Sequence, residues 1–517
     1  MDPYDRIPYL SLPIADTHPD HLAVLGRLFG LPVAAPENCR VLELGCAGGG
    51  NLLPMAVQLP GSRFLGVDLS ANQVAQGRRL IGALGLSNIE LRQGDILQLD
   101  ASTLGTFDYI IAHGVYSWVP APVRERLLAL ARTLLAPAGV FYLSYNSLPG
   151  WRLRGMLRDI LQQDCAGVSE PWARIAKAQQ ALARLEAATR GMDGLAARFL
   201  REEAARLRGM PDSYLLFEYL AENNQAFLFS DFLADTARHG LRYLCDSELA
   251  LQFPATQGSA VEQALADLTD DMAVEQWLDF VSCRAFRQSL LVRDDAAGEG
   301  EIDLERFAAL AFSTDLRLPA KLDLRREQGA SCVRPDGERV ELHHPLTKAI
   351  CRQLTAAYPE RLSLAELLPE ARRQVRATGG GGLAEQVEAL LLELFSLFAH
   401  RTLRAGLTPL RLPPAAEPPM AAPLPRALAA AGATQVPTRH HGIMELDALA
   451  ARLLQLLDGS LTLEQAADRL ADEIQQGRLV PPAGLAGRLP AGERRRERMQ
   501  ALCRELLGQF RRQGILV

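Results

Sequence analysis

The residues with the clearest chemical potential form a glycine-rich stretch after a short apolar strand. The stretch runs from Val41 to Asn51 and reads VLELGCAGGGN. Glycines let a backbone pass close beneath a ligand, and the amides of a first helical turn remain able to donate hydrogen bonds. A strand, a glycine turn and a helix in this order therefore predict a cofactor-binding loop.

Three cofactor classes use such a loop, and two of them do not fit these residues. A phosphate-binding loop ends in Gly-Lys-Ser/Thr, which is absent here. The dinucleotide fingerprint needs glycine at positions 45, 47 and 50, but position 47 is Ala47. The remaining class is S-adenosylmethionine. This ligand has no pyrophosphate, so a longer and looser loop serves it, with Glu43 two residues before Gly45.

Two further acidic residues end later strands. Asp68 stands about 20 residues past the glycines, where a carboxylate can accept hydrogen bonds from both ribose hydroxyls. Asp95 is placed to accept the adenine amino group, with Ile96 against the ring. Each piece also has a structural interpretation, since a glycine turn can be purely structural and Asp68 can cap the helix that starts near Ser70. Their order and spacing together favour the cofactor.

The elements that position these residues alternate between strands and helices. Such alternation predicts βαβ units and a mainly parallel sheet. Two later strands are expected to close the same sheet. The predicted strands are 40–44, 63–67, 89–92, 107–112, 139–145, 240–245 and 286–293, and the predicted helices between the first five are 51–59, 74–84 and 122–135. The fold class is therefore α/β, a Rossmann-like sheet with a helical insertion and mainly helical, winged-helix-like C-terminal modules.

Composition excludes several function classes. The 517 residues carry 55 Lys plus Arg against 61 Asp plus Glu, a net charge of −6, without the basic excess of a general nucleic-acid binder. No apolar run is long enough for a membrane span and the start does not resemble a signal peptide, so a cytoplasmic location is expected. The eight cysteines are scattered without a C-x-x-C pair, which argues against zinc ribbons.

Histidines do not suggest a metal site. His18 and His21 lack a carboxylate-histidine partner set, so no metal is expected. The pairs 343–344 and 440–441 are expected to be solvated in loops.

The sequence resembles the class I methyltransferases, and more narrowly a bacterial group that carries a methyltransferase regulatory domain. That group includes the rickettsial outer-membrane-protein lysine methyltransferases. The resemblance is weaker beyond Gly298, and Ala47 departs from the glycine that many class I members have. The residues that carry the resemblance are 12–13, 17–20, the glycine loop, 112–120 (AHGVYSWVP), 145–151 (YNSLPGW) and 214–293, with FEYL at 217–220.

The resemblance and the composition together divide the chain into seven segments. The segment across residues 4–21 is expected, by resemblance, to lie over the cofactor, with Asp16 or Thr17 as the N-cap of the next helix and Pro19 in its first turn. The expected segments are a lid at 1–35, a cofactor-binding Rossmann-like core at 36–147, a helical insertion at 148–212, a regulatory region that completes the sheet at 213–297, a winged-helix-like module at 298–409, a Pro/Ala-rich linker at 410–440 and a helical module at 441–517.

Methyl transfer from a sulfonium is an in-line displacement, so positioning and exclusion of water matter more than a strong base. A lysine acceptor must arrive neutral, and an apolar aromatic pocket disfavours its ammonium form. Tyr116 and Trp118 follow the central strand, where their faces could also attract the sulfonium. Tyr145 and Asn146 end the neighbouring strand and are predicted to hold the acceptor. The alternative is that these aromatic residues simply pack.

The sequence thus predicts an S-adenosylmethionine-dependent methyltransferase acting on a protein side chain, with a lysine amine favoured by the resemblance. The string His-Gly-Val-Tyr-Ser-Trp replaces the Asp/Asn-Pro-Pro-Tyr/Phe of nucleic-acid amino-methyltransferases, which disfavours base methylation. The alternatives are a biosynthetic methyltransferase with a small-molecule acceptor, whose C-terminal modules form a homodimer, and a non-catalytic cofactor-sensing regulator. The residues assigned to the cofactor are Glu43, Gly45, Cys46, Ala47, Gly48, Asn51, Asp68, Leu69, Asp95, Ile96 and His113.

Overall fold

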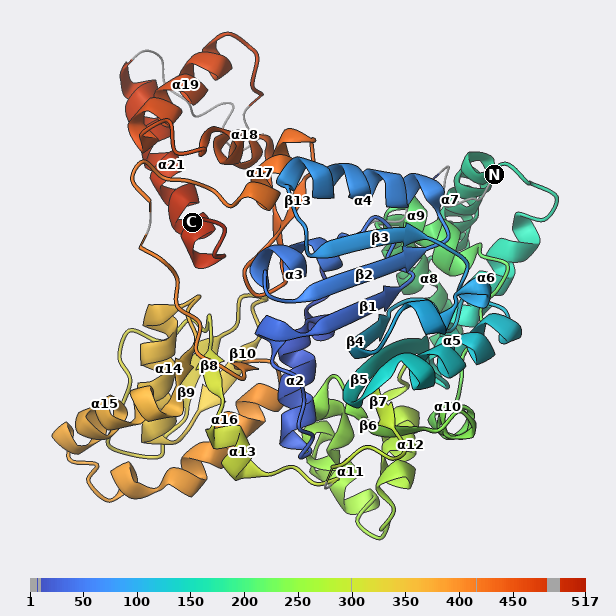
Figure 1. Cartoon of the computed structure of the whole chain (residues 1–517), viewed down its shortest axis with the longest axis horizontal. Coiled ribbons are helices and arrows are strands. Elements are labelled where there is room, and N and C mark those ends of the chain that lie inside the picture. The colour runs from blue at the N-terminus through green and yellow to red at the C-terminus, as the bar shows by residue number, and fades with distance from the viewer. Residues whose placement is uncertain (1–6, 8–10, 299, 415, 481–492) are drawn as a thin grey trace.

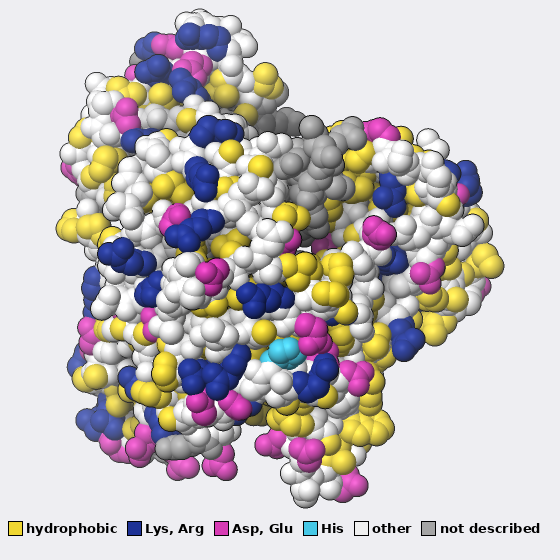
Figure 2. Space-filling view, turned by 45° about the vertical axis from the view of Figure 1, so that its right-hand side comes forward, with side chains coloured by type: hydrophobic (Ala, Val, Ile, Leu, Met, Phe, Trp, Pro, Cys, Tyr) yellow, Lys and Arg dark blue, Asp and Glu magenta, His cyan; other side chains and the backbone are white. Residues whose placement is uncertain are grey.

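A computed structural model describes residues 7, 11–298, 300–414, 416–480 and 493–517. A central sheet separates helices α6, α7 and α8 on one side from the two C-terminal modules on the other (Figure 1). Acidic and basic side chains are interspersed over the face in Figure 2, in keeping with a chain whose charges nearly balance. No helix among the described residues is both long and apolar enough to cross a membrane.

The sheet has seven strands in the order β3-β2-β1-β4-β5-β7-β6. The first five in this order are parallel, and β7 pairs antiparallel with both β5 and β6. The expected α/β class and the expected closing pair of strands are therefore confirmed. The strands are β1 (Arg40–Leu44), β2 (Arg63–Asp68), β3 (Ile89–Gln93), β4 (Phe107–Ala112), β5 (Leu135–Asn146), β6 (Leu241–Asp246) and β7 (Phe286–Arg293).

Both faces of the sheet are buried, which explains why its central strands are apolar throughout rather than alternating. In β4, Tyr109 and Ile111 enter the core on one face, while Ile110 and Ala112 enter the core on the other. The first helices are α2 (Pro19–Leu28), which precedes the sheet, and α3 (Leu52–Gln58), α4 (Ala71–Leu84) and α5 (Ala121–Leu134), which follow β1, β2 and β4. Short 3-10 turns lie at Ala15–Thr17, Pro36–Asn38, Ile96–Gln98, Ala101–Thr103, Leu249–Gln252, Pro254–Gln257 and Leu383–Glu385.

The predicted helical insertion is confirmed and has an apolar core of its own. A π-helical turn, Leu215–Tyr219, follows the insertion and holds the first three residues of the string FEYL, with Leu220 directly after it. The chain then returns to the sheet. The helices of this part are α6 (Gly150–Asp164), α7 (Pro171–Ala188), α8 (Leu195–Arg208), α9 (Asp212–Tyr214), α10 (Phe229–Arg238), α11 (Ser259–Ala264) and α12 (Asp271–Ser282).

The module after position 298 shares one continuous apolar core with the seven-stranded sheet, so the two pack directly against each other. Its Pro-Asp-Gly turn joins the predicted hairpin, and the Ser363–Glu366 capping box is formed. Its elements are α13 (Leu304–Ala308), β8 (Ala311–Ser313), β9 (Ala330–Val333), β10 (Arg339–Leu342), α14 (Pro345–Ala357), β11 (Leu362–Ser363), α15 (Leu364–Ala377), α16 (Val387–Ala399) and β12 (Arg404–Gly406).

The expected linker at 410–440 is only partly a linker. Its second half folds into α17 (Pro423–Ala430) and β13 (Gln435–Pro437), because proline fits the first turn of a helix and alanine favours its interior. Ala421, Ala429 and Val436 enter the core of the C-terminal module. The other elements of that module are β14 (Ile443–Glu445), α18 (Ala448–Leu456), α19 (Leu463–Gln475) and α21 (Glu493–Arg512).

Candidate functional site

The glycine loop between β1 and α3 needs glycine at several positions. Gly45 and Gly49 have φ of +82° and +75°, in the left-handed region that favours glycine. A Cβ at Gly45 would lie 2.6 Å from Val115 Cγ2, and one at Gly50 would lie 2.1 Å from the Ser11 carbonyl oxygen. The backbone at Ser11 therefore lies directly on the loop. Ala47 has φ of +49° and adopts a conformation that costs less for glycine.

Asp68, at the end of β2, braces this loop. Its Oδ2 accepts a hydrogen bond from the Ala47 amide at 2.7 Å, and its Oδ1 accepts one from the Ser70 amide at 2.9 Å. The cap of α4 is Ser70, whose hydroxyl accepts from the Gln73 amide. A carboxylate oxygen can accept two hydrogen bonds, so bracing the loop and contacting ribose hydroxyls are compatible.

Glu43, at the end of β1, is buried beneath the loop. It is 4% exposed, and its Oε1 accepts a hydrogen bond from Asn51 Nδ2 at 2.9 Å. Its Oε2 has no partner among the described residues. Burial raises the pKa of the Glu43 carboxyl to about 8, and the nearby Asp68 adds to this increase. The orphaned oxygen is suited to a cationic ligand, which would favour the ionised form.

The next two predicted positions flank the same edge of the sheet. Asp95 follows β3, where its Oδ1 accepts from the Leu97 amide at 2.9 Å, and the Gly94 amide donates to the Asp68 carbonyl at 2.9 Å. Leu69 is 56% exposed, whereas Asp95 and Ile96 are half-buried. An acidic group beside exposed apolar carbons fits a planar ring that carries an amino group.

His113 follows β4 on the other side of β1. Its Nδ1 lies 3.0 Å from the Tyr142 hydroxyl, and its ring lies between Tyr142 and Phe286. Burial lowers the pKa of His113 to about 4, so the imidazole is neutral at pH 7. Because β3, β2, β1 and β4 are adjacent and parallel, Glu43 and Asp68, Asp95 and His113 all lie along one edge.

The residues predicted to meet the acceptor fall into two groups. Tyr116 and Tyr145 are each 1% exposed and pack against Phe227 and Phe232. Burial raises the pKa of both hydroxyls. Their positions fit the packing interpretation that the sequence left open. Both rings belong to the aromatic cluster at the end of β5.

Trp118 and Asn146 occupy different surroundings. Trp118 is half-buried and meets Trp151 edge to face, with the ring centroids 5.8 Å apart. Asn146 is 2% exposed, and its Nδ2 has no hydrogen-bond partner within the described parts of the chain. An unpaired buried amide is costly, so this amide is a candidate for contact with an incoming group.

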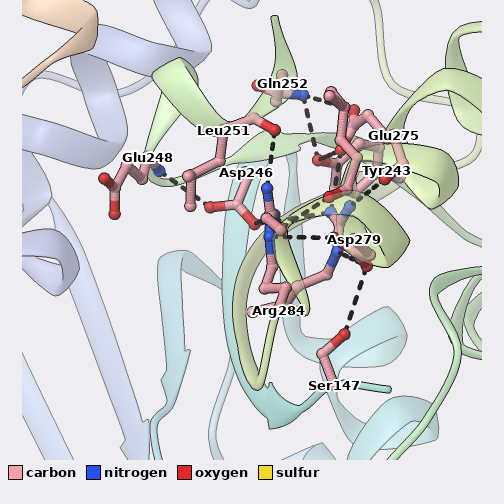
Figure 3. A network of polar contacts seen from close by, with 12 residues as sticks. Ser147, Tyr243, Asp246, Glu248, Leu251, Gln252, Glu275, Asp279 and Arg284 are labelled. Carbon is pink, nitrogen blue, oxygen red and sulfur yellow. Dashed lines mark hydrogen bonds and ion pairs between the residues drawn. The ribbon is translucent and has the colours of Figure 1, made fainter. Parts of the chain in front are cut away.

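A buried ionic network supports this end of β5 (Figure 3). Ser147 donates to Asp279 Oδ2 at 3.3 Å, and Asp279 Oδ2 also accepts from Arg287 Nε at 2.8 Å. Arg287 is fully buried and contacts Glu275 Oε2 at 2.9 Å. The regulatory region therefore fixes the backbone next to Asn146 through charged groups that the sequence did not single out.

Asn51, which the sequence assigns to the cofactor, hydrogen-bonds through its side chain to other residues of the chain. Its Oδ1 accepts from the Ile14 amide at 2.9 Å and from His441 Nε2 at 2.8 Å, while its Nδ2 donates to Thr17 Oγ1 and to Glu43. An amide side chain has two donors and two acceptor sites. All four are used. Asn51 therefore contacts Glu43 beneath the loop and links the loop to the N-terminal segment and to the C-terminal module.

The prediction that the paired histidines are solvated holds for His343, which is exposed, and is wrong for the other three. His441 is 1% exposed and His344 is 4% exposed, whereas His440 is half-buried and its Nε2 contacts the Pro359 carbonyl at 2.8 Å. The predicted cap is also displaced, because His18 is the N-cap of α2 and its Nδ1 accepts from the Asp20 amide. Local sequence offered no signal for the contact between Asn51 and His441, which are 390 positions apart.

Positions 11–18 lie on the glycine loop through Ser11 and Ile14, as the lid prediction requires. Positions 1–6 and 8–10 of the predicted lid lie outside the described residues. Within the described ranges, no group of three or more histidine, cysteine or acidic side chains could hold a metal ion.

Three segments of the chain match known protein families. Residues 36–189 match a methyltransferase domain, residues 211–293 a predicted methyltransferase regulatory domain, and residues 417–515 the C-terminal winged helix domain of PKMT. The uncharacterised protein RP028 of Rickettsia prowazekii (strain Madrid E) is 35% identical over 241 residues, 96% of its length and 47% of this chain. The chain belongs to the methyltransferases that carry a methyltransferase regulatory domain.

Further relatives of this methyltransferase extend the comparison. RP789 of the same organism, also uncharacterised, is 38% identical over 294 residues, which are 57% of this chain. The methyltransferase spans about half of that relative, 53% of its length. Among solved structures, PKMT2 from Rickettsia typhi has a TM-score of 0.86 at 26% identity, with 98% of this chain and 100% of that chain covered. PKMT2 in complex with AdoHcy has a TM-score of 0.85 at 25% identity, with 99% and 100% covered.

Proposed function

We propose that this methyltransferase transfers a methyl group from S-adenosylmethionine to a lysine side chain of a protein. The observation that carries the proposal is the likeness to PKMT2, a protein lysine methyltransferase, across the whole chain including both C-terminal modules. A shared catalytic domain alone would leave the acceptor class open, because the same fold serves many acceptors.

The residues along the sheet edge fit the cofactor. Glu43 offers a buried oxygen without a partner for the cationic amino group, Asp68 is placed for the ribose hydroxyls, and Asp95 with Ile96 is placed for the adenine. When bound, S-adenosylmethionine supplies an electrophilic methyl group on a sulfonium. His113 remains neutral at pH 7 and therefore does not repel that positive charge.

The acceptor side is formed by the ends of β4 and β5. The apolar rings of Trp118 and Trp151 disfavour an ammonium ion by desolvation, so a lysine amine beside them is held in its neutral form. The Asn146 Nδ2 is a donor and suits the backbone carbonyl of a peptide better than the amine, whose lone pair must face the methyl group. The buried rings of Tyr116 and Tyr145 exclude water from the protein side of the acceptor site.

The test is transfer of labelled methyl groups from S-adenosylmethionine into a bacterial lysate by the full chain. We expect label in the precipitated protein, recovered after acid hydrolysis as N-methylated lysine. Label that stays with small metabolites would replace the proposal with a biosynthetic activity. AdoHcy binding without any transfer would replace it with a cofactor-sensing role, and the Asp68→Ala variant supplies the background value.

A further inference from the structure

A cavity of about 450 Å³ lies where three parts of the chain meet, away from the predicted cofactor contacts. Its walls come from residues 15–21 of the N-terminal segment, the end of α3 at Gln58, the middle module around 401–410, and Arg439 to His441 of the C-terminal module. Cavities of this size are typical of small-molecule sites. The proposed methyl transfer does not use it.

Arginines dominate the cavity wall. Five of them line it, against only Asp16, Asp20 and Glu37 as acidic groups. Four have carboxylate partners, since Arg361 pairs with Asp20, Arg401 with Asp16, Arg404 with Asp315, and Arg334 with Asp336 and Glu338. In the part of the chain that the structure describes, the Arg439 guanidinium makes no hydrogen bond or ion pair. Burial, and then nearby Arg361, lower the pKa of Arg439.

Three further nitrogens, each on a residue that lines the cavity, are buried without a hydrogen-bond partner. His18 Nδ1 accepts from the Asp20 backbone amide, so in the neutral ring the proton is on Nε2, which is buried without a partner. His441 Nε2 donates to Asn51 Oδ1, which leaves its buried Nδ1 as an unused acceptor. Arg361 Nε is a third buried nitrogen without a partner.

These groups together indicate which ligand chemistry the cavity suits. The unpaired guanidinium of Arg439 and the N–H groups of His18 and Arg361 require an anion with several acceptor oxygens. The lone pair of His441 requires that the same ligand also carries a proton donor. A phosphate group meets both needs, because its oxygens bind guanidinium groups strongly and it still carries an O–H near its second pKa of about 6. Sulfate supplies the oxygens without the proton.

We propose that this cavity binds a phosphate group, free or on a small phosphorylated molecule, between Arg439, Arg361, His18 and His441. Such a site is one hydrogen bond away from the cofactor loop. His441 donates to Asn51, the last residue of the loop, and Asn51 donates to Glu43. Ligand binding there is therefore linked to the loop, although the site itself does not depend on the proposed lysine activity.

The test is calorimetric titration of the full chain with inorganic phosphate and with sulfate at pH 6.5 in low salt. We expect phosphate to bind at least tenfold more tightly than sulfate, and the Arg439→Gln variant to bind phosphate at least tenfold more weakly. Glycerol 3-phosphate, titrated in parallel, separates the two sources: tighter binding than phosphate supports a phosphorylated molecule, and equal binding supports free phosphate.

The matched control is Arg478→Gln, an exposed arginine of the same module that does not line the cavity. It should bind phosphate like the unaltered chain. Should Arg439→Gln fail to fold, Arg439→Lys keeps the charge without the two-pronged geometry and should weaken binding severalfold. Absence of heat with phosphate, equal binding of sulfate, or unchanged binding in the Arg439 variants would each overturn the proposal.

Discussion

Replacement of Asn51 by alanine tests whether the C-terminal module and the N-terminal segment are held on the cofactor loop by one side chain. The substitution leaves three buried groups without their partner: the Ile14 amide, His441 Nε2 and the Glu43 carboxyl. Thr17 keeps its hydrogen bond to the Ile14 carbonyl. Each unsatisfied buried group costs about 1–3 kcal/mol, so we expect the junction to lose roughly 3 kcal/mol or more.

Local hydrogen exchange is the suitable assay, because a chain of several domains does not unfold in one two-state step. A loss of roughly 3 kcal/mol corresponds to exchange about a hundredfold faster, and we expect it in peptides that cover residues 11–18 and 438–442. Asn88→Ala is the matched control, since Asn88 also makes three hydrogen bonds, to the carbonyls of Ala56, Leu59 and Ser62. Its effect should stay near residues 56–62. Unchanged exchange at 11–18 in Asn51→Ala, or equal acceleration there in Asn88→Ala, would refute the reasoning.

Four further substitutions probe the loop and the acceptor side. Burial raises the Glu43 pKa from its usual 4.5 to about 8, so the folded chain holds a proton that the unfolded chain releases between these values. The free energy of unfolding should therefore fall as pH rises from 4.5 to 8, by at most about 5 kcal/mol, and Glu43→Gln should flatten that slope in denaturant titrations. Ala47→Gly should stabilise the chain by about 0.5–1 kcal/mol in thermal unfolding, because φ at this position is +49°. Asp68→Ala should weaken AdoHcy binding more than tenfold in calorimetry, since each charge-assisted hydrogen bond contributes about 1.5–3 kcal/mol; unchanged affinity would contradict the ribose placement. Trp118→Ala should lower turnover in the labelling assay while AdoHcy affinity stays nearly the same, and loss of binding would make this ring part of the scaffold.

Sequence reasoning succeeded where the information is local. The glycines of the loop, the acidic residue that ends β2 and the apolar runs of the strands each follow from neighbouring residues, so the sheet and its edge could be predicted. The errors concern residues whose surroundings come from elsewhere in the chain. His441 looks like a loop residue until Asn51 and His18 contact its ring, and nothing near Asn51 in the sequence indicates that Ile14 and His441 donate to its side-chain oxygen.

The surroundings of His441 are those of a buried side chain and not of a solvated loop residue. Its φ of +56° is uncommon for a side chain of this kind, and its burial beside His18 lowers its pKa well below the usual range. The backbone conformation opposes folding at any pH, the lowered pKa opposes it only below about pH 6.5, and the single hydrogen bond to Asn51 contributes only about 1 kcal/mol net. A ligand on the unused Nδ1 would add a second bond and offset that cost. If the C-terminal module needs this ligand to dock fully, ligand binding would also stabilise the cofactor loop through the hydrogen bond between His441 and Asn51.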